Sequence, residues 1–267
     1  MKRLTKPLDE TEVLLRIKNL IETRFLHLQL CDRNQALRDS VQELEREREI
    51  SERLLLNILP ISVAQRLKQQ EQTIADSFSE ATVLFADIVD FTSICARLTP
   101  EELVGWLNGL FSVFDQLTVR HGLEKIKTIG DSYMVAGGLP SARDDHAEAV
   151  ADFALDLREA IATQDSPVGL RVELRIGLHT GHVVAGVIGT HKFSYDLWGE
   201  TVNIASRMQS HGLPGVIQVS EATYLRLCDQ YNFAERGTIT VKGQRTLRTY
   251  LLEERKEAPS SALAATQ

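Results

Sequence analysis

Hydrophobic and polar positions follow three patterns along the chain, and the longest of them is helical. Between residues 26 and 59, apolar residues recur at alternating intervals of three and four, without a glycine or a proline. This spacing predicts a coiled-coil dimerisation helix with a seam of modest strength, because Asn34, Arg48 and Ser51 fall at core positions. These polar positions either keep the helix pair switchable or simply weaken it. The mixed charges at 43–49 are typical of a solvated outer face.

A shorter helical pattern precedes the seam. The turn signal Lys6–Pro7 and the N-cap candidate Asp9 come before apolar residues at helical spacing, which predicts a capped helix in residues 1–25. The segment also resembles the last strand-to-helix segment of a response-regulator receiver domain, whose final helix follows a Lys-Pro dipeptide. Residues 1–25 are therefore either the remnant of an upstream receiver module or simply a helix start. Pro60 predicts the end of the long helix, and 60–76 are expected to form a linker helix.

The third pattern mixes short apolar strands with amphipathic helices and predicts one compact domain at 77–254, followed by a flexible tail at 255–267. Thr99, Pro100 and Glu102 form a capping box that starts a long helix. Strands joined by both hairpins and helices indicate an α+β fold rather than a doubly wound one. The expected elements are strand 82–86, a loop to 98, helix 100–121, a hairpin within 125–137, helix 144–163, strands 171–177 and 183–188 joined by a turn at Thr180–Gly181, a loop at 189–199, helix 201–210, strand 217–219, helix 221–228 and a hairpin around Lys242–Gly243.

Composition and charge narrow the tasks of such a domain. Of the 267 residues, 43% are hydrophobic and 25% are charged, a balance that allows a packed core. The net charge of −7 argues against nucleic-acid binding as the main task. The three cysteines lack metal-site spacing and are expected to be free thiols, and no apolar run approaches the roughly 20 residues of a membrane span. We therefore expect a cytoplasmic protein without a membrane span.

Two aspartates stand out because each interrupts an apolar strand pattern. Asp87 follows the apolar run that begins at Ala81, and Asp131 follows Gly130 between two alternating segments, which predicts a hairpin with an acid at its turn. A buried carboxylate needs a cation nearby or must become neutral. Two carboxylates at neighbouring strand ends suit Mg²⁺ or Mn²⁺, which bind carboxylate and phosphate oxygens.

A second polar pair lies on a predicted helix. Asn203 and Arg207 are four residues apart and therefore share one helix face. An amide and a guanidinium on one face can hold a sugar and stabilise charge that develops on a phosphate. An exposed helix also carries such residues merely to stay solvated, so the pair is informative only in combination with other motifs.

Four segments supply that combination: FADIVDFT at 85–92, KIKTIGDSYM at 125–134, YDLWGETVNIASR at 195–207 and VKG at 241–243. In order and spacing they resemble the motifs of the class III nucleotidyl cyclase catalytic domain, over residues 78–252. The resemblance implies a ferredoxin-like or palm-like α+β domain with flanking helices. It also implies an enzyme that converts a nucleoside triphosphate to a 3′,5′-cyclic nucleotide and pyrophosphate, with two Mg²⁺ or Mn²⁺ ions per site.

By position, the resemblance implies a role for each matching residue. Asp87 and Asp131 correspond to the two metal-bridging carboxylates, with the Ile88 carbonyl as a further ligand; Phe91 and Thr92 lie where the loop backbone meets the triphosphate; Lys127 and Asp196 correspond to the pair that reads adenine; Asn203 and Arg207 correspond to the ribose-orienting and transition-state residues; and Lys242 corresponds to the lysine that grips the terminal phosphates.

The predicted base is adenine. Lys127 is a donor and Asp196 an acceptor, which matches N1 and N6 of adenine, whereas guanine presents the reverse pattern. We therefore expect an adenylyl cyclase acting on ATP, with a guanylyl cyclase as the near alternative and a catalytically silent nucleotide-binding dimerisation module as the other. In the family the metal aspartates and the Asn–Arg helix meet across a subunit interface, so a single chain type implies a homodimer with two interface sites.

Some residues depart from the family pattern or remain open. Asp90 lies at a variable position and is either a loop residue or a third ligand. His182 lies where some members have a phosphate-binding arginine, and it is either a core or surface histidine or an auxiliary phosphate contact. Leu139–Pro140 replaces the acidic residues that would complete a diguanylate cyclase motif, and no P-loop or GxGxxG sequence occurs.

Overall fold

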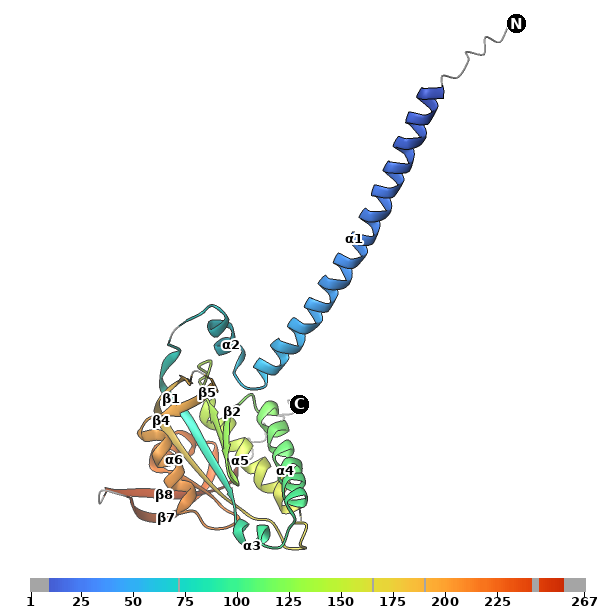
Figure 1. The fold of residues 1–267 in the computed structure, drawn as a ribbon. Helices are drawn as coiled ribbons and strands as arrows, with labels where there is room; N and C mark the ends of the chain where they lie inside the picture. The colour runs from blue at the N-terminus through green and yellow to red at the C-terminus, as the bar shows by residue number, and fades with distance from the viewer. Residues whose placement is uncertain (1–9, 72, 165, 190, 242–244, 257–267) are drawn as a thin grey trace, which may run out of the picture. The chain divides into compact units, whose positions relative to one another are not determined.

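The chain folds into two units that divide after Asn57, and each is described by itself. The computed structural model describes residues 10–71, 73–164, 166–189, 191–241 and 245–256 (Figure 1). The predicted cap at Asp9, the turn at Lys6–Pro7, the phosphate-gripping Lys242 and residues 257–267 of the predicted tail lie outside these ranges. Among the described residues, no helix combines the length and apolar character that a membrane span requires.

Nearly all of the described part of the first unit is one helix, α1 (Glu10–Leu56), which confirms the predicted long N-terminal helix. None of its residues is buried, and the seam residues Leu37 and Leu44 are 63% and 64% exposed. Ion pairs between residues one helical turn apart stabilise the helix, such as Arg16 with Glu12 at 2.7 Å. An apolar seam at this level of exposure is typical of a helix that pairs with another helix, and that pairing stays a prediction.

The linker between the long helix and the sheet is helical only in part. Helix α2 (Ile61–Lys68) follows Pro60, whose φ of −56° suits the position before a helix. The predicted linker helix at 60–76 is therefore too long, because the helix already ends at Lys68. Arg66 of α2 contacts Asp76, at the start of the first strand, at 2.6 Å. That strand already begins at Ala75.

The second unit contains one eight-stranded sheet with the order β2-β3-β1-β4-β6-β8-β7, and β5 pairs with β4 beside this path. Every pairing is antiparallel except that of β4 with β6. Hairpins and a crossover in one sheet confirm the predicted α+β class. The strands are β1 (Ala75–Ile88), β2 (Glu124–Ile129), β3 (Ser132–Gly137), β4 (Leu174–Ile188), β5 (Ser194–Trp198), β6 (Ile217–Ser220), β7 (Tyr231–Val241) and β8 (Arg245–Arg255).

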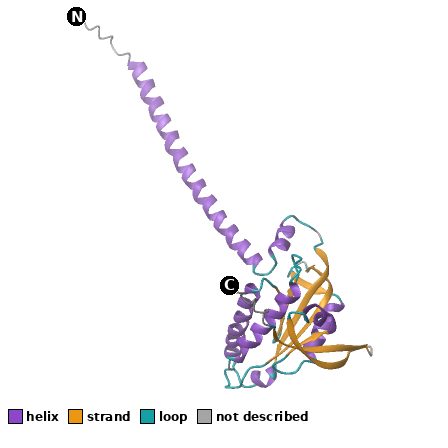
Figure 2. Ribbon diagram, turned by 180° about the vertical axis from the view of Figure 1, so that it is seen from behind, coloured by secondary structure: helices purple, strands orange, loops and turns teal. Residues whose placement is uncertain are grey.

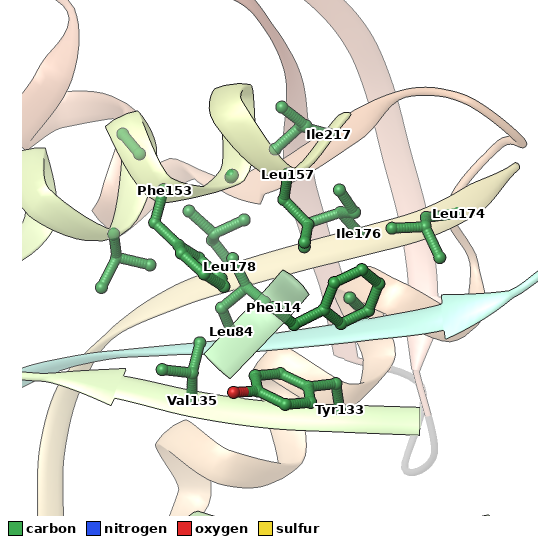
Figure 3. Packing of buried hydrophobic residues seen from close by; sticks show 14 of the residues in the cluster. Leu84, Phe114, Tyr133, Val135, Phe153, Leu157, Leu174, Ile176, Leu178 and Ile217 are labelled. Carbon is green, nitrogen blue, oxygen red and sulfur yellow. The ribbon is translucent and has the colours of Figure 1, made fainter. Parts of the chain in front are cut away.

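Helices cover both faces of the sheet (Figure 2). They are α3 (Phe91–Cys95), α4 (Pro100–Arg120), α5 (His146–Ala162), α6 (Glu200–Ser210) and α7 (Glu221–Leu227). Helices α4 and α5 pack on the face that carries Leu84 of β1 and Ile176 of β4, where the main core forms around Phe114 and Phe153 (Figure 3). Because side chains alternate along a strand, Asp87 of β1 and Gly177 of β4 face the opposite side, where α6 lies.

Two local predictions are confirmed in atomic detail. Thr99 Oγ1 accepts a hydrogen bond from the Glu102 amide at 3.3 Å, and the Glu102 carboxylate accepts one from the Thr99 amide at 2.9 Å, so the capping box is complete. In the predicted hairpin, Ile129 pairs with Ser132 across the turn that contains Gly130 and Asp131. Gly130 adopts a φ of +63°, a conformation that glycine reaches without a steric penalty.

The turn predicted at Thr180–Gly181 is wrong, because β4 runs without interruption from Leu174 to Ile188. Gly181 serves close packing instead: a Cβ atom at this position would lie 2.7 Å from Oγ1 of Thr201 on α6. Glycine within a strand marks either a break or a close approach, and here it marks the approach.

Two segments predicted as loops contain short elements. Helix α3 lies within the loop that was expected to run to residue 98, and β5 lies within the loop expected at 189–199, where Asp196 pairs with Gly186 of β4. Both elements are five residues long, which is too short for a hydrophobic period to stand out.

Candidate active site

The two predicted metal carboxylates lie side by side. Asp87 is the penultimate residue of β1, where it is paired with Ser132 of β3 on one side and Arg175 of β4 on the other. Asp131 lies in the tight turn immediately before Ser132. The β1–β3 pairing therefore brings residues from two separate motifs together, close enough for the Asp131 carboxylate to raise the pKa of Asp87.

This pair of acids is electrostatically incomplete. Burial and the adjacent Asp131 carboxylate raise the pKa of Asp87 to about 6, while Arg175 and the side-chain amide of Gln209 oppose that rise. A carboxyl whose charged form is disfavoured by a neighbouring carboxylate forms, together with that neighbour, a donor set that a divalent cation would satisfy. Among the described residues, no group of three or more His, Cys, Asp and Glu side chains could hold a metal ion, so a cation here would depend on backbone, substrate and water oxygens for its remaining ligands.

The predicted triphosphate contact follows directly after this pair. Asp90 has a φ of +55° and precedes α3, and its carbonyl accepts a hydrogen bond from Ser93 at 2.9 Å. Phe91 stacks on Trp106 of α4, with 6.5 Å between the ring centres, and Thr92 is exposed. The left-handed residue thus turns the chain sharply, so that the first residues of α3 lie only a few positions beyond Asp87.

The predicted base-reading pair is already assembled. The Lys127 ammonium on β2 and the Asp196 carboxylate on β5 form an ion pair of 2.5 Å. The other carboxylate oxygen of Asp196 accepts a hydrogen bond from the Leu197 amide at 2.8 Å, which fixes its orientation. The lysine side chain is 36% exposed, against 16% for the aspartate, so the donor has access to solvent.

Asn203 and Arg207 lie on α6 and are directed away from the sheet. The inward side of the helix is apolar, with Ala205 and Met208 fully buried, whereas Asn203 is exposed. Within the described ranges, neither polar side chain forms a hydrogen bond or an ion pair. The fold therefore joins Asp87 with Asp131 but leaves Asn203 and Arg207 on an open helix face.

Two residues that the sequence reasoning did not select also face Asp87. Arg175 lies opposite Asp87 in the β1–β4 register, and Gln209 reaches it from the C-terminal end of α6. The sequence around Arg175 or Gln209 does not reveal which residue of another element lies opposite. The alternation of side chains along β1 does indicate that Asp87 points away from the α4–α5 core.

A cavity of the second unit lies away from these residues. It has a volume of about 650 Å³ and lies at the N-terminal end of α6, where the described lining residues include His179, His182, Glu221 and Arg248. Apart from His182, no residue to which the sequence analysis gave a possible role in catalysis or binding belongs to this lining. His182 is exposed and contacts Ser77 at 2.8 Å, in agreement with its reading as a surface histidine.

Comparison with known proteins identifies the fold and the family. The family model of the adenylate and guanylate cyclase catalytic domain matches residues 73–254. An adenylate cyclase of Mycobacterium tuberculosis is 51% identical over 227 residues, which cover 84% of this chain and 51% of that protein. Human guanylate cyclase soluble subunit beta-2 is 39% identical over 252 residues, which cover 92% of this chain and 40% of that protein. The chain thus spans about half or less of the length of these relatives.

Solved structures of similar fold point to the same family. The guanylate cyclase domain of RhGC from Catenaria anguillulae, determined with GTP, superposes with a TM-score of 0.66 at 36% identity, over 68% of this chain and all of that one. The adenylyl cyclase CyaB from P. aeruginosa superposes with a TM-score of 0.63 at 27% identity, over 68% of this chain and 97% of that one. The chain belongs to the family of adenylate and guanylate cyclase catalytic domains.

Proposed function

We propose that the chain is an adenylyl cyclase that converts ATP to 3′,5′-cyclic AMP and pyrophosphate. The Lys127–Asp196 ion pair carries this proposal. An ammonium donates to N1 of adenine and a carboxylate accepts from N6, whereas guanine presents the opposite pattern to both groups. A site that reads a base through buried polar groups discriminates strongly, because the wrong base leaves those groups unpaired. The 51% identity to an adenylate cyclase supports the same substrate.

The proposed site forms between two copies of the chain. Asp87 and Asp131 of one copy would face Asn203 and Arg207 of the other, which accounts for the open face of α6. A twofold homodimer then contains two equivalent sites, each with one complete set of residues. We further propose that α1 pairs with the α1 of the second copy and transmits signals from an upstream sensor or receiver module. Deletion of residues 1–55 with unchanged dimerisation and turnover would contradict that role.

The residues have separate tasks in this proposal. Two Mg²⁺ or Mn²⁺ ions, held by Asp87, Asp131 and the Ile88 carbonyl, supply activation of the ribose 3′-hydroxyl and charge neutralisation at the phosphates when bound. Asn203 orients the ribose, and Arg207 stabilises the charge that grows on the α-phosphoryl oxygens. The remaining contacts with the triphosphate come from the backbone at Phe91 and Thr92 and from Lys242. The 3′-hydroxyl loses its proton to solvent and its oxygen forms a bond to the α-phosphorus, while the bond from the α-phosphorus to pyrophosphate breaks and pyrophosphate leaves with the electron pair.

A guanylyl cyclase is the second candidate, because human guanylate cyclase soluble subunit beta-2 matches 92% of the chain. The two candidates differ in what Lys127 does. In an adenylyl cyclase, Lys127→Gln removes the charged donor to N1 and lowers kcat/KM for ATP by at least about tenfold, since hydrogen bonds to charged groups contribute about 1.5–3 kcal/mol.

Lys125→Gln is the matched control for that substitution. Lys125 lies on the same strand but pairs with Asp115 of α4 at 2.6 Å, so its loss should leave base preference unchanged. If Lys127→Gln leaves the ratio of ATP to GTP turnover unaltered, the proposed base-reading role is wrong. Absence of turnover with either nucleotide would favour a silent nucleotide-binding module.

A further inference from the structure

The C-terminal end of α6 contacts its own sheet more closely than any side chain would allow. A Cβ atom at Gly177 of β4 would lie 1.9 Å from the amide nitrogen of Gln209 and 2.4 Å from the carbonyl carbon of Met208. At the end of the helix, the Gly212 amide donates to the Gln209 carbonyl at 2.8 Å. The backbone of α6 at Gln209 is therefore fixed against β4 by main-chain contacts.

From this fixed position the side chain of Gln209 reaches Asp87 of its own chain. Gln209 is only 8% exposed, and its side-chain amide lies close enough to the Asp87 carboxyl to lower the pKa of that group. An amide N–H donated to a carboxylate stabilises the charged form and restricts rotation, and it brings no further negative charge to the site. Arg175, which lies opposite Asp87 in the β1–β4 register, supplies the nearby positive charge.

We infer that Gln209 is a positioning residue that holds Asp87 in the orientation required for divalent-cation binding. Arg207 and Gln209 are two positions apart and point to roughly opposite sides of α6. On the proposed shared-site arrangement, on which this inference rests, one helix therefore serves two sites. Its inward face orients the metal carboxylate of its own chain, and its outward face supplies Asn203 and Arg207 to the other copy.

The first test is metal affinity. Gln209→Met keeps the length of the side chain and removes the amide, and loss of such an outer contact typically weakens metal binding by about 10- to 100-fold. Binding of Mn²⁺ is measured directly, from the loss of the free-ion electron paramagnetic resonance signal in the presence of ATP. The Mn²⁺ dependence of turnover should shift by the same factor, with the KM for ATP at saturating Mn²⁺ unchanged.

Gln218→Met is the matched control. Gln218 is a fully buried glutamine on β6 that contacts the sulfur of Met208 at 3.9 Å, next to Gln209 in the sequence of α6. Its side-chain oxygen has no hydrogen-bond partner among the described residues, so its replacement leaves the carboxylate pair untouched. Equal Mn²⁺ affinity of Gln209→Met and the unsubstituted protein would overturn the inference, as would an equal loss in Gln218→Met.

The second test separates a local role from a general one. A heterodimer of Asp87→Ala and Arg207→Ala chains retains one intact site, whose Asp87 comes from the Arg207→Ala chain. Adding Gln209→Met to that chain should raise the Mn²⁺ requirement about tenfold or more. Adding it to the Asp87→Ala chain should leave the requirement unchanged. Equal effects of the two placements would refute positioning within the same chain, whereas failure of the original heterodimer to turn over ATP would refute the shared site itself.

Discussion

Replacement of Gly177 by alanine tests how strictly the sheet determines the position of α6. The added Cβ atom would lie 1.9 Å from the nitrogen of Gln209 and 2.4–2.5 Å from two further backbone atoms, whereas ordinary contacts measure 3.4–4 Å. No rotamer change relieves a clash with backbone atoms, so α6 must retreat by about 1.1 Å to reach the shortest contact of 3.0 Å that real Cβ atoms show, and by about 1.5 Å to reach an ordinary contact. That displacement moves Gln209 on one face and Arg207 on the other.

Two losses follow from the displacement. Overpacking of this kind costs about 1–3 kcal/mol, which should appear as a lower midpoint in urea denaturation at unchanged slope. A misplacement of about 1 Å in catalytic groups can lower turnover about 100-fold, so kcat should fall by at least that factor. Turnover is measured without urea, at a temperature at which the variant is fully folded, so that the loss of turnover is separated from the loss of stability.

Gly109→Ala provides the control for this prediction. Gly109 lies within α4, and a Cβ atom there has no neighbour within 4 Å. Alanine is favoured over glycine inside a helix by about 0.5–1 kcal/mol, so this variant should be slightly more stable and equally active. Wild-type turnover in Gly177→Ala would refute the argument that the close contact of α6 with β4 aligns the site.

Two further predictions concern stability. Burial lowers the pKa of His146, whose ring contacts the Thr82 hydroxyl at 2.9 Å. Because the folded pKa lies below the unfolded value of about 6.5, the free energy of unfolding is retained above about pH 6.5 and falls as the pH drops below it. His146→Gln should flatten this loss in urea titrations between about pH 7 and 5. Thr99→Ala removes the hydroxyl from the capping box of α4 and should lower the free energy of unfolding by about 1 kcal/mol. Ser112 is solvent-exposed within the same helix, and an equal loss of stability in Ser112→Ala would contradict the capping role.

Local chemistry explains which parts of the fold could be predicted from sequence. The capping box at Thr99 and the hairpin at Asp131 depend on residues within a few positions of one another, and both were predicted correctly. The break at Gly181 was predicted wrongly, because a glycine that opens a turn and a glycine that admits a neighbouring helix look the same in one sequence. The neighbour in question, Thr201, lies on an element that meets β4 only in the folded protein.

The same limit applies to the candidate site. Asp87 was conspicuous because an acid in an apolar strand is energetically costly, and Asp131 because it occupies a turn. The meeting of Lys127 with Asp196, which are 69 positions apart, depends on β5, an element that the sequence pattern did not reveal. Nothing in the sequence pattern distinguished Gln209, because a glutamine at the end of a helix is usually solvated. Its position near Asp87 depends on the close contact of α6 with Gly177, which exists only in the folded protein.

The most direct test of the central claim is the initial rate of cyclic nucleotide formation from ATP and from GTP, measured with Mg²⁺ and with Mn²⁺ over a series of protein concentrations. We predict that cyclic AMP forms faster than cyclic GMP with either metal. We also predict that the rate per chain rises with concentration until the homodimer saturates, because each site needs two copies. Faster cyclisation of GTP would contradict the role of Lys127 and Asp196, and a rate per chain that stays constant down to concentrations at which the protein is monomeric would contradict the shared site.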